Sequence, residues 1–235
     1  LTNREPGITI EDAYQIQLRM IQRRIDAGET IIGKKIGVTS KVVMDMLKVN
    51  QPDFGMMTSG MVFNEGESID TSTMIAPRAE AEVAFVLKSD LMGPGVTAAD
   101  VLRATDFVVP CFEIVDSRIQ DWKIKIQDTV ADNASCGVLV LGGRRKSPAD
   151  IDLALAGMVL EKNGEIISTS TGAAVQGSPV NAVAWLANTL GNLGIGLKAG
   201  EVILSGSQSP LVPVKAGDSL VCTVGGLGGT SVRFI

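Results

Sequence analysis

The β-rich part of the chain opens with the stretch PRAEAEVAFVL, residues 77–87. From position 81 onward the expected strand is apolar on both faces apart from one glutamate, which is typical of a strand buried in a sheet. Glu80 and Glu82 stand two residues apart, so both carboxylates leave the same face of the strand. A solvated strand edge is the simpler explanation of such a pair, but two carboxylates at the end of a buried strand need a partner.

A third carboxylate, that of Glu113, lies in the apolar stretch VVPCFEIV, residues 108–115. Pro110 interrupts this stretch and indicates an edge strand or a β-bulge. An unpaired carboxylate in such surroundings is strongly destabilising, and two explanations stay open. Either Arg78 or Arg118 pairs with Glu113, or the three glutamates share a divalent cation. Ligation by carboxylates alone favours a hard cation, Mg²⁺ or Mn²⁺.

The composition of the 235 residues excludes several classes of protein. The chain has no histidine, which removes Ser-His-Asp and Cys-His catalysis and every histidine-containing metal site. Cys111, Cys136 and Cys222 stand far apart, so we expect free thiols and a reducing, cytoplasmic compartment. A net charge of −5 without a basic cluster disfavours a nucleic-acid surface. No apolar run approaches the ~18 residues of a membrane-spanning helix.

The order of elements predicts an α+β fold with a single catalytic domain over residues 1–235. A helical N-terminal segment over 1–60 is expected to precede a β-rich body over 76–235 that carries the three glutamates. Chemistry in this domain has to rely on carboxylates, lysines, hydroxyls, backbone amides or a hard metal ion.

Local signals place individual elements. Thr9 and Thr97 each precede an aspartate by three residues, which is typical of helix N-termini. Asn163-Gly164, between two short apolar runs, is the strongest hairpin signal in the chain. Ser178-Pro179 predicts the start of another helix, with Ser178 as its N-cap.

Two further polar residues are candidates for the site. Lys35 lies in a short expected strand, where it either reaches the surface or points inward towards an anionic ligand. Lys34 faces the other way and is expected at the surface. Asp53 stands in a Pro-Asp-Phe-Gly turn, which it could simply cap.

Five motifs, in this order, closely resemble the 2-oxopent-4-enoate (2-hydroxypenta-2,4-dienoate) hydratases, a branch of the fumarylacetoacetate hydrolase superfamily. They are GKKIG (33–37), QPDFG (51–55), PRAEAE (77–82), DSRIQDW (116–122) and VADNASCG (130–137). The resemblance covers essentially the whole chain. It implies a rolled mixed β-structure with an N-terminal helical segment, and a Mg²⁺ or Mn²⁺ ion.

The resemblance also implies roles for particular residues. The metal ligands would be Glu80, Glu82 and Glu113, the catalytic residues Lys35 and Asp53, and the substrate-binding residues Ser135 and Arg78. Hydrolases of the superfamily activate water with a His–Glu pair. Because this chain has no histidine, hydrolysis of a C–C bond is disfavoured.

The activity expected from the resemblance is that of a hydro-lyase in aromatic meta-cleavage catabolism. It would add water to 2-hydroxypenta-2,4-dienoate and give 4-hydroxy-2-oxopentanoate. The dienol would be protonated at C5, and water would then add at C4. The alternatives are the related 4-oxalocrotonate decarboxylase and a catalytically silent subunit that partners it. Expected partners are the small-molecule substrate, further copies of the chain in a homo-oligomer, and a 4-oxalocrotonate decarboxylase.

Overall fold

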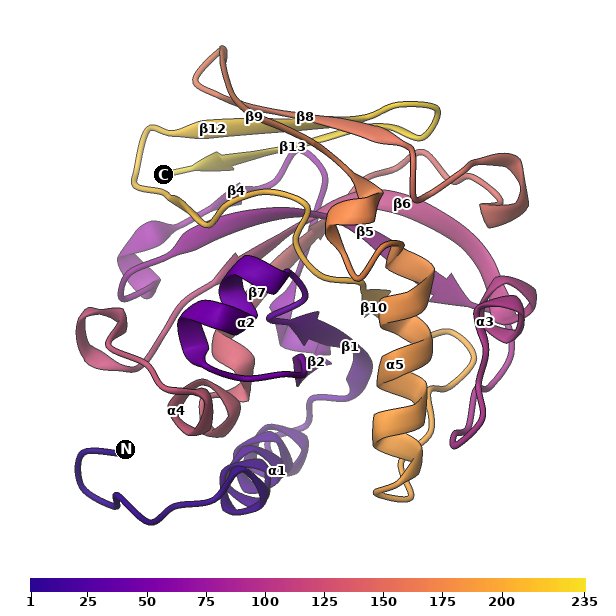
Figure 1. Ribbon diagram of the computed structural model, residues 1–235. Coiled ribbons are helices and arrows are strands. Elements are labelled where there is room, and N and C mark those ends of the chain that lie inside the picture. Colours follow the sequence, from indigo (N-terminus) through magenta and orange to yellow (C-terminus); the bar gives the residue numbers. More distant parts are fainter.

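The computed structural model describes the backbone of residues 1–235 and all side chains except those of Val42, Met46 and Leu47. Two β-sheets lie one above the other (Figure 1). The larger sheet consists of β1 (Ile31–Gly37), β2 (Asp53–Thr58), β3 (Val62–Asn64), β5 (Arg78–Leu87), β6 (Thr105–Val115), β7 (Cys136–Leu141), β10 (Val202–Leu204) and β11 (Val212–Pro213). The smaller sheet consists of β4 (Ser68–Ile69), β8 (Gly157–Lys162), β9 (Glu165–Thr171), β12 (Ser219–Val224) and β13 (Gly228–Phe234).

Helices lie around the larger sheet, and α5 runs beside β1 and β10 (Figure 1). The α-helices are α1 (Ile10–Asp26), α2 (Lys41–Leu47), α3 (Ala98–Ala104), α4 (Ile126–Ala131) and α5 (Pro179–Gly191). Single 3₁₀ turns are η1 (Ser59–Met61), η2 (Thr71–Thr73), η3 (Gln120–Trp122), η4 (Asn133–Ser135), η5 (Pro148–Asp150) and η6 (Gly172–Ala174). None of the described helices is long and apolar enough to cross a membrane.

Several local predictions are confirmed. Thr9 and Thr97 form complete capping boxes with the aspartates three residues on, at the starts of α1 and α3. The Asn163-Gly164 turn joins β8 to β9. Ser178 is the N-cap and Pro179 the first residue of α5, as predicted, although the Ser178 side chain forms no capping hydrogen bond.

The larger sheet is mixed, with the strand order β2-β1-β10-β5-β6-β7-β3. β1 is parallel to β10 and β3 to β7, while the other neighbours along this path are antiparallel. The α+β class with a mixed β-structure is therefore confirmed. Residues 1–60 are helical only in part, because β1 and β2 lie in this segment and belong to the main sheet.

Pro110 does not mark a strand edge, because β6 pairs with β5 on one side and β7 on the other. Its carbonyl accepts a hydrogen bond from the backbone N–H of Gly142 at 2.9 Å, just beyond the end of β7. The nitrogen and carbonyl of one residue point to the same side of a strand. The missing N–H of Pro110 therefore faces β7, at the place where the β6–β7 ladder ends. The strand therefore keeps its central position at little cost in hydrogen bonds.

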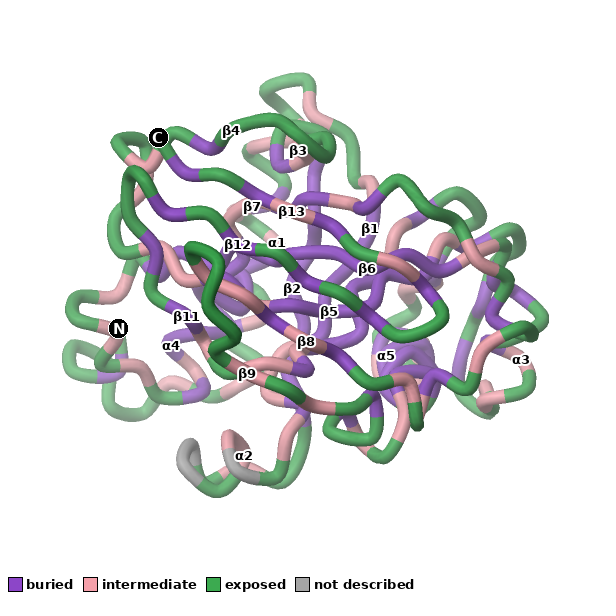
Figure 2. Tube along the Cα trace, turned by 90° about the horizontal axis from the view of Figure 1, so that it is seen from above, coloured by how far each residue is buried: buried purple, intermediate pink, exposed green. Residues whose placement is uncertain are grey.

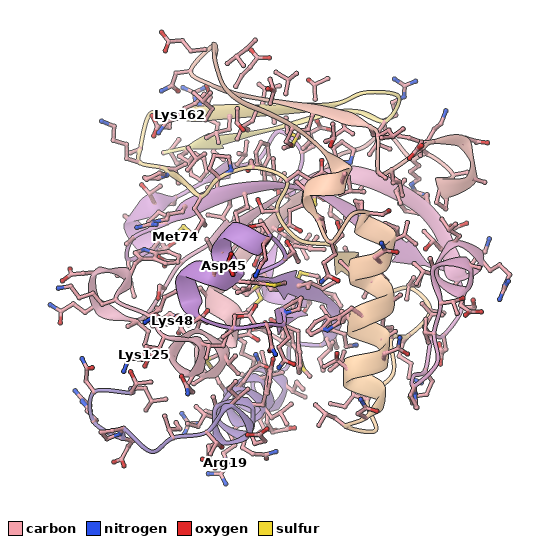
Figure 3. All side chains as sticks on the ribbon, in the orientation of Figure 1. Arg19, Asp45, Lys48, Met74, Lys125 and Lys162 are labelled. Carbon is pink, nitrogen blue, oxygen red and sulfur yellow. The ribbon has the colours of Figure 1, made fainter. Side chains whose placement is uncertain are left out.

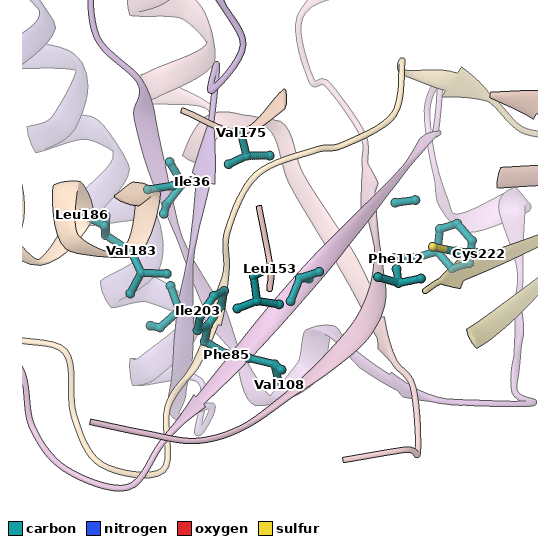
Figure 4. Close-up of a cluster of buried hydrophobic side chains, with 14 of the residues drawn as sticks. Ile36, Phe85, Val108, Phe112, Leu153, Val175, Val183, Leu186, Ile203 and Cys222 are labelled. Atoms are coloured by element: carbon teal, nitrogen blue, oxygen red, sulfur yellow. The ribbon is translucent and has the colours of Figure 1, made fainter. Parts of the chain in front are cut away.

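The core lies between the sheets and under α5. Residues along β12 alternate between exposed and buried, whereas β5 and β6 beneath it are buried over most of their length (Figure 2). Phe112 of β6 meets Cys222 of β12 between the two sheets (Figure 4). Val183 and Leu186 of α5 cover Ile36 at the other end of the cluster. All three cysteines are free and buried, as predicted.

Lys34 is buried, contrary to the prediction that it reaches the surface. Its ammonium pairs with Glu201 at 2.5 Å, and both side chains are almost fully removed from solvent. Lys34 leaves the face of β1 opposite to Lys35. Its ion pair with Glu201 connects β1 to the residue just before β10.

Replacing this lysine should therefore destabilise the fold. In Lys34→Met we expect the free energy of unfolding to fall by roughly 3 kcal/mol, because Glu201 is left buried without its cation. Urea denaturation followed by circular dichroism measures the loss. The matched control is Arg103→Met, which breaks an exposed pair with Asp100 and should change stability by less than about 1 kcal/mol. Equal stability of the two variants would contradict a structural role for the buried pair.

Candidate active site

Three glutamates meet where β5 and β6 run side by side. Glu80 and Glu113 are directly opposite each other in the antiparallel ladder, and Glu82 follows on the same face of β5. One carboxylate oxygen of each residue lies within 4.8 Å of the others. Glu82 and Glu113 are fully buried, and Glu80 is half-buried.

The chemistry of this cluster fits a hard divalent cation. Among the described residues, Oε1 of Glu82 and both carboxylate oxygens of Glu113 lack a hydrogen-bond partner. Burial, and then the charge of Glu113, raise the pKa of Glu80 to about 7 and that of Glu82 well above its usual range. Three carboxylates that repel one another in a buried place are stabilised by a cation with oxygen ligands, such as Mg²⁺ or Ca²⁺.

Lys35 brings the nearest positive charge to the cluster. Its ammonium lies 3.3 Å from Oε1 of Glu113 and donates a hydrogen bond to the carbonyl of Ala134 at 3.1 Å. Burial disfavours its charged form, but the carboxylates of Glu113, Asp53 and Glu80 outweigh burial and raise the pKa of Lys35. Side chains such as Arg19, Lys48 and Lys125 point outward instead (Figure 3).

Asp53 reaches the same place from β2, where it is opposite Gly37 of β1. A Cβ atom on Gly37 would lie 2.3 Å from Oδ1 of Asp53 and 3.1 Å from Nζ of Lys35, so only glycine leaves room for this approach. Oδ1 of Asp53 has no hydrogen-bond partner among the described residues, and burial raises the pKa of this carboxyl. Asp53 is thus the first residue of a strand and faces the site, rather than a simple turn cap.

Ser135 is held by an unusual backbone turn. Asn133, Ala134 and Ser135 all have left-handed φ angles, of 58°, 52° and 55°, which are unfavourable for residues other than glycine. The Asn133 side chain both accepts from and donates to the backbone of Met56, at 2.8 Å each. These bonds tie the turn to β2 and present Ser135 to the site.

Neither arginine considered for Glu113 pairs with it. Arg118 binds the Asp132 carboxylate at 2.5 Å and the carbonyl of Cys136 at 3.1 Å, so it braces the left-handed turn from outside. Arg78 stacks on the ring of Trp122, with its guanidinium carbon 4.4 Å from the ring centroid. The cation next to Glu113 is that of a lysine on another strand.

A cavity of about 490 Å³ opens beside this cluster. Lys35, Asp53, Arg78, Glu80 and Ser135 all line it, whereas Glu82 and Glu113 are fully buried and are not part of its lining. Apolar side chains, Trp122 among them, make up much of the remaining lining. The arrangement combines a concave, partly apolar surface with convergent charged groups, as small-molecule sites do.

Sequence reasoning missed one segment of the site, residues 205–211, between β10 and β11. Gly206 has a φ of +106° and donates its backbone N–H to Oε2 of Glu82 at 2.7 Å. A Cβ atom there would lie 2.4 Å from the Thr39 side chain. In the sequence this segment is a polar, glycine-containing stretch between two apolar strands. An ordinary loop has the same pattern, so the sequence did not mark it as part of the site.

Comparisons with known proteins agree with this architecture. The family model described as "Fumarylacetoacetate (FAA) hydrolase C-terminal" matches residues 34–234. A 2-hydroxyhexa-2,4-dienoate hydratase of Comamonas testosteroni is 59% identical over 236 residues, with 100% of this chain and 89% of the relative covered. A 2-hydroxypent-2,4-dienoate hydratase of Pseudomonas putida is 66% identical over 196 residues, with 83% and 88% covered.

A solved structure is also similar over the whole chain. The 4-oxalocrotonate decarboxylase from Pseudomonas putida G7, complexed with magnesium and adipate, superposes with a TM-score of 0.97 at 40% identity, with 100% of this chain and 89% of that chain covered. The same decarboxylase complexed with calcium and acetate gives a TM-score of 0.95. The fold thus holds divalent cations in a relative.

Proposed function

The chain belongs to the fumarylacetoacetate hydrolase family, and we propose that, like the hydratases it resembles, it is a hydro-lyase that adds water to 2-hydroxypenta-2,4-dienoate. The product would be 4-hydroxy-2-oxopentanoate, in aromatic meta-cleavage catabolism. The single observation that carries the proposal is the buried triad of glutamates with Lys35 against it, at the wall of a cavity.

The triad is proposed to hold the cofactor. Bound by Glu80, Glu82 and Glu113, a Mg²⁺ or Mn²⁺ ion would stabilise negative charge on the substrate oxygens as a Lewis acid. Arg78, stacked on Trp122 at the cavity, is assigned to bind the substrate carboxylate. Ser135 offers a hydroxyl to the same substrate.

Proton transfer is assigned to the two remaining polar residues. Lys35 would stabilise the dienolate anion or move the proton that C5 gains as the 2-oxo group forms. Asp53 would orient the water that adds at C4 and accept one of its protons, and its unpartnered Oδ1 supports this role. C3 then gains a proton, so the reaction consumes one water and needs no other reactant.

Decarboxylation of 4-oxalocrotonate is the second candidate, favoured by the similarity to the solved decarboxylase. Both relatives of higher identity described above are hydratases, which favours hydration. The three free cysteines support a cytoplasmic compartment. Ile166 and Ile167, exposed on β9 at the end of the smaller sheet, support assembly into a homo-oligomer, while a complex with a decarboxylase stays a proposal from the resemblance alone.

Product analysis tests the proposed function. Purified protein with Mg²⁺ is supplied separately with 2-hydroxypenta-2,4-dienoate and with 4-oxalocrotonate, and products are identified by NMR. We expect 4-hydroxy-2-oxopentanoate from the first and no CO₂ from the second. CO₂ release without hydration would identify a decarboxylase, and no product from either substrate would favour the silent subunit.

A further inference from the structure

Gln208 is a buried amide at the cavity that the mechanism above does not use. It lies in the segment 205–211, is only 5% exposed and lines the cavity that also contains Lys35 and Asp53. Its backbone N–H donates to the carbonyl of Ala81 at 3.0 Å, which fixes its main chain against β5 between Glu80 and Glu82. Its side-chain oxygen Oε1 has no hydrogen-bond partner among the described residues.

Two neighbouring polar side chains of the cavity, those of Ser207 and Ser209, already form hydrogen bonds within the protein. Ser207 donates its hydroxyl to the carbonyl of Ser209 at 2.8 Å, and the Ser209 hydroxyl accepts the backbone N–H of Ala81 at 3.0 Å. Buried polar atoms are nearly always paired, so a buried amide with a free oxygen at a cavity indicates a ligand that completes it.

The chemistry of the amide selects which part of the ligand it contacts. Lys35, Arg78 and the cation proposed for the triad match the anionic 2-oxo acid end of the substrate. An amide is neutral and carries both an acceptor and donors, as do a water molecule and an alcohol. Gln208 therefore matches the oxygen that becomes bonded to C4, which is neutral both as water and as the 4-hydroxyl.

We propose that Gln208 binds the oxygen that adds at C4, first as water and then as the 4-hydroxyl of the product. This inference rests on the proposed hydratase function. Gln208 would orient the water by hydrogen bonds. The proton that the water loses would still pass to Asp53. The residue is thus a specificity determinant for a 4-hydroxy-2-oxo acid.

Two ligands that differ by this hydroxyl test the inference. Binding of 4-hydroxy-2-oxopentanoate and of 2-oxopentanoate to the Mg²⁺-loaded protein is measured by calorimetry, for the wild type and for Gln208→Met. We expect the wild type to bind the hydroxylated ligand about tenfold more tightly, the scale of one hydrogen bond. In Gln208→Met this ratio should fall to about 1, with the affinity for 2-oxopentanoate little changed, because methionine keeps the volume and removes the amide.

Gln22→Met, at an exposed glutamine of α1, is the matched control and should keep the wild-type ratio. Gln208→Glu, which retains a hydrogen-bond acceptor, should keep part of the affinity ratio. It provides the test if the methionine variant does not fold. A ratio unchanged in Gln208→Met overturns the inference. So does an equal loss for both ligands, which would place Gln208 at the 2-oxo acid end. Failure of the hydratase function is seen separately, as absence of hydration by the wild type.

Discussion

Glu113→Gln is expected to abolish turnover, lowering kcat/KM by about 10³-fold or more, the scale of losing a main electrostatic stabiliser of the transition state. The amide keeps the shape of the side chain but carries no charge, so it binds a hard cation less strongly than a carboxylate does. It also removes the carboxylate that lies 3.3 Å from the ammonium of Lys35. Exhaustive treatment with EDTA should have the same effect on the wild type, and added Mg²⁺ should reverse it.

Metal content separates loss of the cation from loss of the fold. Mass spectrometry of the dialysed protein should find a divalent ion bound to the wild type and much less bound to Glu113→Gln, while circular dichroism stays the same. Glu165→Gln, at an exposed position of β9, is the control and should keep both activity and metal. Full activity after complete chelation would rule out the metal-dependent mechanism.

Lys35→Met is expected to lower kcat/KM by about 10²-fold or more, the effect of losing one catalytic proton-transfer or electrostatic group. Three carboxylates and one divalent cation leave a formal charge of −1, to which the substrate adds more negative charge. The ammonium of Lys35 offsets part of it from within the site. Methionine keeps most of the apolar stem and deletes the charge. Steady-state kinetics with saturating Mg²⁺ measures the change.

Lys34→Met is the matched comparison, since the two lysines are adjacent but leave opposite faces of β1. It should lose stability and keep kcat/KM within a few-fold at temperatures where it remains folded. Lys35→Met should show the opposite pattern: a smaller loss of stability and a large loss of activity that added Mg²⁺ does not restore. If both variants lost activity equally, the role assigned to Lys35 would be wrong.

Much of the site follows from local sequence. The two-residue period of a strand places Glu80 and Glu82 on one face, and the apolar residues around Glu113 require it to be buried. The capping boxes at Thr9 and Thr97 involve contacts within four residues, so the sequence alone determines them. The absence of histidine excludes whole classes of mechanism without any structure.

Only the tertiary structure decided which strands are neighbours. Lys35 and Asp53 reach Glu113 because β1 and β2 join the sheet through β10, a strand from the far end of the chain. The same pairing buries Lys34 against Glu201 and places Gly206 and Gln208 beside β5. Periodicity along one strand reports which side chains share a face. It carries no information about the strand that will lie opposite, because that depends on long-range packing of the whole chain.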